Sequence, residues 1–131
     1  ARAPAGESGS PPPQAPPGAL VVDQPVRSGQ QVYARGSDLV VMAPVNAGAE
    51  LIADGHIHVY SALRGRAIAG ARGWAGARIF AAMMQPQLVS IAGVYQTSDE
   101  PLPGSVWGTA ASVALRSDES GDKLVFQPIS S

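Results

Sequence analysis

Residues 38–69 read DLVVMAPVNAGAELIADGHIHVYSALRGRAIA, and this stretch decides the fold class. Short runs of branched and small apolar residues alternate there with joins marked by Gly, Pro, Asn or Asp. Such punctuation is typical of consecutive short β-strands. No apolar stripe in the chain keeps a helical spacing over three turns. The sequence therefore predicts an all-β fold, with strands at residues 31–34, 38–43, 50–53, 56–60, 66–69, 78–81 and 88–92.

These runs repeat along the chain. Asp38-Leu39-Val40-Val41 resembles His56-Ile57-His58-Val59, and residues 48–53 resemble residues 76–81. The first repeat starts at residue 38 and again at residue 56. A period of that length that holds three short strands suggests one coil of a parallel β-helix. Each coil has too little apolar surface to fold alone, so stacked coils share one continuous core.

The composition favours that architecture, because only 5% of the residues are aromatic and a narrow coil admits few rings. Glycines fall at or near the expected corners, where a positive φ suits them. An antiparallel β-sandwich also has a turn about every 8–12 residues, so the strand pattern alone leaves that fold open.

The two ends of the chain differ from the repeating part. Residues 1–19 hold six of the twelve prolines and no Val, Ile, Leu or aromatic residue, which predicts a flexible Pro-rich interdomain linker before a domain at residues 20–131. Residues 111–116 and 123–127 flank a polar segment, which predicts a C-terminal β-hairpin. Trp107 is expected to cap the open end of the stack.

Charge and composition exclude several classes of function. The chain has 131 residues with nine Lys or Arg against ten Asp or Glu, a balance that argues against a nucleic-acid binder. It has no cysteine for a disulfide or thiolate site, and no apolar run long enough to span a membrane. No nucleophile motif or phosphate-binding glycine loop is present, so we expect a protein that is not an enzyme and has no cofactor.

His56 and His58 could place two imidazoles on one metal ion, since alternate residues of a strand share a face. They are the only two histidines, and a third ligand would have to come from Asp54 or Glu50. We therefore expect exposed residues that alternate with buried Ile57 and Val59, and no metal site.

The segment at residues 25–34, which contains Arg27-Ser28-Gly29-Gln30, resembles the start of the C-terminal domain of the MinC family of cell-division inhibitors. Further blocks agree in the same order at residues 48–55, 57–60, 63–71 and 88–93. The resemblance implies a short right-handed parallel β-helix, with three strands per coil, that forms a homodimer. It implies binding to ATP-bound MinD and opposition to FtsZ assembly at wrong sites. The expected location is the cytoplasm, with recruitment to the inner face of the membrane through MinD and no direct insertion.

The resemblance also implies which residues bind the partner. Arg27, Ser28, Gly29 and Gln30 match the motif associated with MinD, and Arg64, Gly65 and Arg66 match a second shared block. The chemistry agrees, because an arginine fork pairs with a carboxylate, and glycine allows a close backbone approach.

Two features qualify this assignment. Arg64 and Arg66 are expected to share one strand face, with Arg72 and Arg78 extending it, or else to form a solvated edge. The chain departs from the family pattern at Trp74, where many relatives carry an acidic residue on the surface associated with MinD.

A self-assembling scaffold similar to bactofilins, without MinD binding, is the alternative function.

Overall fold

The computed structural model describes residues 18–99 and 102–129. This part of the chain contains eleven strands and no helix, so it offers no helix that could cross a membrane. The strands are β1 (Ala19–Val22), β2 (Gln31–Ala34), β3 (Asp38–Val41), β4 (Glu50–Ala53), β5 (Ile57–Leu63), β6 (Arg66–Ala69), β7 (Arg78–Met84), β8 (Leu88–Ile91), β9 (Val94–Thr97), β10 (Ala111–Asp118) and β11 (Gly121–Pro128). The predicted linker at residues 1–19 lies outside the described residues except for Gly18 and Ala19, and β1 begins at Ala19.

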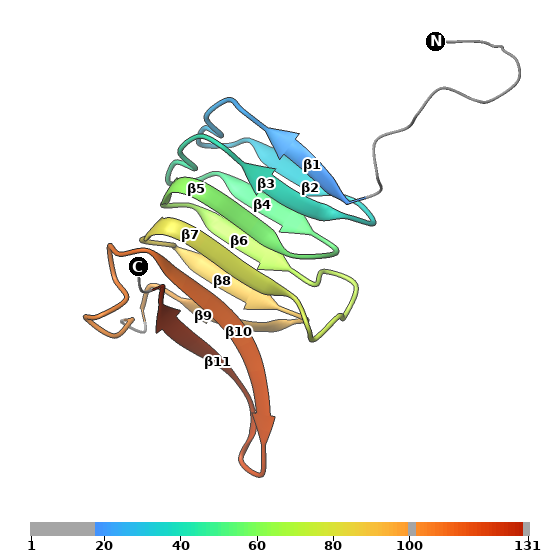
Figure 1. Cartoon of the computed structure of the whole chain (residues 1–131), viewed down its shortest axis with the longest axis vertical. Coiled ribbons are helices and arrows are strands. Elements are labelled where there is room, and N and C mark those ends of the chain that lie inside the picture. The colour runs from blue at the N-terminus through green and yellow to red at the C-terminus, as the bar shows by residue number, and fades with distance from the viewer. Residues whose placement is uncertain (1–17, 100–101, 130–131) are drawn as a thin grey trace, which may run out of the picture.

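The strands form two sheets that stack as successive coils (Figure 1). One sheet has the order β1-β3-β5-β7-β10-β11, and the other has the order β2-β4-β6-β8-β9. The chain alternates between the sheets, so every pair from β1 to β8 within a sheet is parallel. This confirms the predicted parallel β-helix.

The third side of each coil is shorter than expected. Between the first three coils it consists of single bridged residues, with Val26 paired to Val45 and Val45 paired to Leu63. Between the third and fourth coils it consists of the last two pairs of β5 and β7, which follow a register shift after Val59. Leu39 pairs with Ile57, which confirms that residues 38–41 and 56–59 occupy the same place in successive coils. The resemblance between residues 48–53 and 76–81 is not a coil repeat, because β4 and β7 belong to different sheets.

The core is a column of small and branched side chains. Leu39, Ile57 and Ile79 pair in register in one sheet and are each fully buried. Leu51, Ala67 and Val89 do the same in the other sheet. Side chains alternate between the two faces of a strand, so each coil contributes one layer to the interior.

The last coil is closed by antiparallel strands. β9 pairs with β8, and β10 pairs with β7, so the parallel ladder ends at this point in both sheets. Val106 is fully buried with the core, whereas its neighbour Trp107 remains 46% exposed. In this segment it is therefore Val106, and not Trp107, that is buried with the core.

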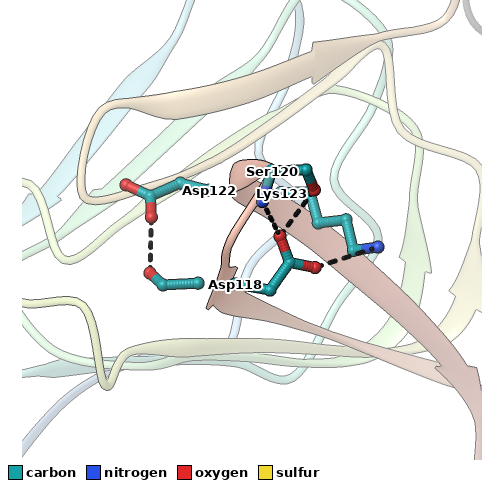
Figure 2. A network of polar contacts seen from close by, with 5 residues as sticks. Asp118, Ser120, Asp122 and Lys123 are labelled. Carbon is teal, nitrogen blue, oxygen red and sulfur yellow. Dashed lines mark hydrogen bonds and ion pairs between the residues drawn. The ribbon is translucent and has the colours of Figure 1, made fainter.

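The predicted C-terminal hairpin is present, and its strands reach further into the polar segment than expected. β10 and β11 pair down to Asp118 and Gly121, which leaves a two-residue loop. Asp118 accepts hydrogen bonds from the amide and hydroxyl of Ser120 at 2.9 and 2.6 Å, and Lys123 lies 3.5 Å away (Figure 2). These bonds from Ser120 hold the pKa of Asp118 below its usual range. The hairpin tip is thus held by its own side chains.

Candidate functional site: a stacked arginine corner

The Arg27-Ser28-Gly29-Gln30 segment forms a tight turn between bridged Val26 and β2. The amide of Gln30 donates to the carbonyl of Arg27 at 2.9 Å. The side-chain oxygen of Gln30 accepts from the amide of Arg27 at 2.7 Å, so the first and last residues hold each other. Gly29 has a φ of +84°, a conformation that glycine adopts without strain.

Equivalent segments of the next coils stack on this turn. The bridges from Val26 to Val45 and from Val45 to Leu63 bring the residues that follow them, Arg27, Asn46 and Arg64, side by side. We call this surface the arginine corner; it comprises residues 27–30, 46–49, 64–65 and 85–87. The corner lies at the amino ends of β2, β4, β6 and β8.

Two arginines face solvent at this corner. Strands in a sheet lie about 4.8 Å apart, so Arg27 and Arg64 are roughly 10 Å apart across two coils. Within the described residues, the Arg27 guanidinium has no hydrogen-bond or ion-pair partner. Arg64 contacts the side-chain oxygen of Gln85 at 3.3 Å and the sulfur of Met83 at 3.9 Å, both uncharged groups. The corner therefore presents two cations whose charge is not neutralised by the contacts that the structure records.

Arg66 is placed differently from the prediction. Arg64 follows the end of β5 and Arg66 opens β6, so the corner separates them and they do not share a strand face. Arg66 lies 3.9 Å from Glu50 on the outer face of the second sheet, and Glu50 also accepts from the side chain of Gln31. This exposed pair contributes little to stability, but it reduces the charge that Arg66 offers a partner.

The three glycines of the corner have different roles. A Cβ on Gly29 would meet nothing within 4 Å, so its surroundings are open and only its φ requires glycine. Gly65 is buried, and a Cβ there would lie 2.4 Å from the carbonyl oxygen of Ala49. Gly48 has a φ of +85°, and its carbonyl accepts the amide of Gly29 at 3.0 Å.

The sequence reasoning missed four residues of this corner: Asn46, Gly48, Gln85 and Gln87. A signal for two of them exists, because residues 46–49 read Asn-Ala-Gly-Ala and repeat the glycine position of Arg27-Ser28-Gly29-Gln30. Gln85 and Gln87 have no such signal, since they reach the corner only through the stacking of the fourth coil.

The remaining candidates lie elsewhere. Arg72 lines an open hollow with Asp38 and Trp74 at the carboxyl ends of the second-sheet strands, and Arg78 opens β7 in the first sheet. Neither extends the arginine corner. Trp74 packs edge-on against His56, with ring centroids 4.9 Å apart, and so stands at the other end of the second sheet from Arg27.

His56 and His58 alternate with buried Ile57 and Val59, as expected, but both histidines are half-buried instead of exposed. Their ring centroids are 6.0 Å apart, and His58 stacks on Phe80 at 4.9 Å. Burial lowers the pKa of His58, and the neighbouring His56 lowers it further. The described residues contain no group of three or more His, Cys, Asp or Glu side chains arranged to hold a metal ion.

A second polar cluster lies at the carboxyl end of β2. Asp54 accepts from the amide of Gly36 at 2.6 Å and from the hydroxyl of Tyr33 at 2.8 Å. The Gly36 bond lowers the pKa of Asp54, and the bond to Asp54 raises the pKa of Tyr33. These contacts join consecutive coils and have a structural role.

Comparison with known proteins matches the chain to one family. The model of the septum formation inhibitor MinC, C-terminal domain, matches residues 20–129. A probable septum site-determining protein MinC from Chromobacterium violaceum is 56% identical over 112 residues, which are 86% of this chain and 46% of the relative. The protein of that name from Ralstonia pickettii is 49% identical over 132 residues, or 98% of this chain and 48% of the relative. The chain thus spans about half the length of the curated relatives it matches.

A solved structure also matches the fold. It is a chain of the MinC:MinD cell division protein complex of Aquifex aeolicus, with a TM-score of 0.73 and 31% sequence identity. The match covers 86% of this chain and 87% of that chain.

Proposed function

Because this chain belongs to the family of the septum formation inhibitor MinC, C-terminal domain, we propose that its arginine corner binds MinD. The module acts without catalysis, as the docking and dimerisation part of an inhibitor of septum assembly. The Pro-rich segment before β1 serves as the linker to the inhibitor's other domain. The domain binds MinD in its ATP form at the membrane. It is therefore held at the inner membrane face without inserting into it.

The uncompensated Arg27 guanidinium is the observation that carries this proposal. It stands on a tight turn, near Arg64, at a corner held by backbone hydrogen bonds and by the side-chain hydrogen bonds of Gln30 and Gln87. A preformed site loses little conformational entropy on binding. Two fixed cations suit an acidic surface on the partner, because guanidinium groups pair bidentately with carboxylates. The fold match to a chain of a MinC:MinD complex supports the choice of partner.

We propose that the homodimer forms through the outer face of the first sheet. Val21, Val40, His58 and Phe80 pair in register across that face, with no charged side chain among them. Exposed Met42 and Tyr60 follow the paired residues Val41 and Val59. An apolar surface of this kind is typical of an interface, and a second copy of the chain presents the same surface to it.

FtsZ is the proposed target of the whole inhibitor. Dimerisation places two arginine corners on one assembly, so a dimer can engage two MinD molecules and gain avidity. Membrane-bound MinD then concentrates the inhibitor where septum assembly is to be blocked.

Binding to purified MinD tests this proposal. The full chain should bind MinD loaded with ATP and bind MinD loaded with ADP more weakly. Arg27→Ala should weaken the ATP-dependent binding at least about 10-fold, as for loss of a charged hydrogen-bonding group. Arg116→Ala, which removes an exposed arginine from β10, is the matched control and should bind as the unmodified chain does. Equal binding by both variants would reject the role of the corner, and ordered polymers of the chain alone, with no MinD binding, would favour a scaffold.

A further inference from the structure

The corner is not the same length in every coil. In the first two coils, four residues separate the bridged residue from the second sheet: residues 27–30 lie between Val26 and Gln31, and residues 46–49 between Val45 and Glu50. In the third coil, only residues 64–65 lie between Leu63 and Arg66. Glu50 nevertheless pairs with Arg66, so the corner of the third coil is two residues shorter than those of the first two coils.

This shortening removes a hydrogen-bond acceptor. Between the first two coils, the amide of Gly29 donates to the carbonyl of Gly48 at 3.0 Å. The amide of Gly48 would donate in the same way to the third coil. The third coil has no residue in that position, because Arg64 follows the bridge and Gly65 already packs against the carbonyl of Ala49.

A side chain of the fourth coil replaces the missing peptide. The backbone amide of Gln87 donates to the carbonyl of Gly65 at 2.9 Å, which fixes Gln87 beside the short corner. The side-chain oxygen of Gln87 then accepts from the amide of Gly48 at 2.8 Å, across the third coil and 39 residues along the chain. A glutamine carboxamide has the chemistry of a peptide group, so it completes the series of hydrogen bonds between coils that the short corner interrupts.

We propose that Gln87 is a positioning residue for the partner-binding turn and acts through Gly48. Its carboxamide holds the Gly48 peptide, and the Gly48 carbonyl holds the amide of Gly29 in the middle of the turn. Glycine has no side chain to restrict it, so the Gly48 peptide depends on hydrogen bonds for its orientation. The proposal rests on the proposed binding of MinD by the arginine corner.

Gln87→Leu removes the acceptor at nearly constant volume, and Gln87→Glu keeps an acceptor oxygen in the same place. Gln127→Leu, on β11, is the control for the same chemical change away from the corner. Affinity for ATP-bound MinD would be measured for each full-length chain, together with hydrogen exchange at the Gly48 and Gly29 amides by NMR and the thermal unfolding midpoint.

Gln87→Leu should weaken MinD binding about 3- to 10-fold, the range for one hydrogen bond, and speed exchange at Gly48 and Gly29. Gln87→Glu should restore slow exchange at Gly48, and Gln127→Leu should match the unmodified chain in every measurement. Faster exchange at both glycines with unchanged affinity, or unchanged exchange at Gly48, would overturn the role of Gln87. Failure of the unmodified chain to bind MinD would instead overturn the proposed function, and the exchange data would separate the two results.

Discussion

Gly48 packs against Ser28 so closely that a Cβ on Gly48 would lie 2.3 Å from the Ser28 hydroxyl oxygen. The second coil thus supports the turn of the first coil through a residue that has no side chain. Its positive φ and this contact both require glycine, and both bear on the position of the Arg27-Ser28-Gly29-Gln30 turn.

Gly48→Ala should therefore weaken MinD binding as well as stability. The φ of +85° costs an L-residue about 1–2 kcal/mol, and the added methyl group must displace the Ser28 side chain. Gly36→Ala is the matched control, because Gly36 has a φ of +69° and a Cβ there would meet nothing within 4 Å. Urea unfolding should show a loss of stability for both variants, larger for Gly48→Ala because of the contact with Ser28, and only Gly48→Ala should lose affinity. Equal affinities would contradict the support of the turn by Gly48.

Gln30→Ala should loosen the turn without unfolding the domain. It removes the oxygen that accepts the Arg27 amide at 2.7 Å, and this exposed bond contributes about 1 kcal/mol or less. We expect weaker MinD binding with a thermal midpoint close to that of the unmodified chain. Gln31→Ala is the control, because its side chain contacts Glu50 instead of the turn. A Gln30→Ala variant that binds MinD normally would show that the turn keeps its shape without this bond.

Tyr60→Asp should prevent dimerisation. Tyr60 is 61% exposed beside the apolar outer face of the first sheet, so a carboxylate there would be desolvated in the interface. Tyr95→Asp is a matched control, since Tyr95 is 66% exposed on β9 in the second sheet. Analytical ultracentrifugation at micromolar concentration should find monomers for Tyr60→Asp and dimers for Tyr95→Asp. The reverse result would place the interface on the second sheet.

Acidification should destabilise the domain through His58. Its pKa is lower in the folded chain, because burial disfavours the charged ring, so the unfolded chain binds the proton first. The stability associated with neutral His58 is present above the ordinary imidazole pKa of about 6.5 and is lost as the pH falls toward the lower folded value. Urea unfolding at about pH 7.5 and about pH 5, on either side of that pKa, should show this loss of stability. The His58→Gln variant should lose less stability over the same range. Parallel pH profiles for the two proteins would exclude His58 as the cause.

Local patterns in the sequence predicted the all-β class and favoured the β-helix, and the parallel pairing of the strands excluded the β-sandwich that those patterns left open. The pairing of Leu39 with Ile57 follows from apolar spacing alone, because each layer of the core repeats the same small set of side chains. The hairpin at β10 and β11 follows from two apolar runs around a polar loop. The single-residue third side was not predictable in the same way, since one bridged residue has no periodic signal.

The candidate site was predictable only in part. Arg27 and Gln30 close a turn within four residues, so the contacts that close the turn are local in the sequence. Arg64 and Arg66 looked equivalent in the sequence. In the structure Arg64 contacts Gln85, whereas Arg66 lies beside Glu50. Their separation depends on where β5 ends, a boundary that neighbouring coils impose.

The sequence by itself determined the all-β class and the exposed turn and favoured stacked coils, because strand alternation, glycine corners and short turns arise from residues close together in the chain. Only the tertiary structure decided that Gln87 would hold Gly48 from 39 residues away. A corner two residues shorter than those of the first two coils leaves an amide without an acceptor, and which side chain supplies one depends on how whole coils stack.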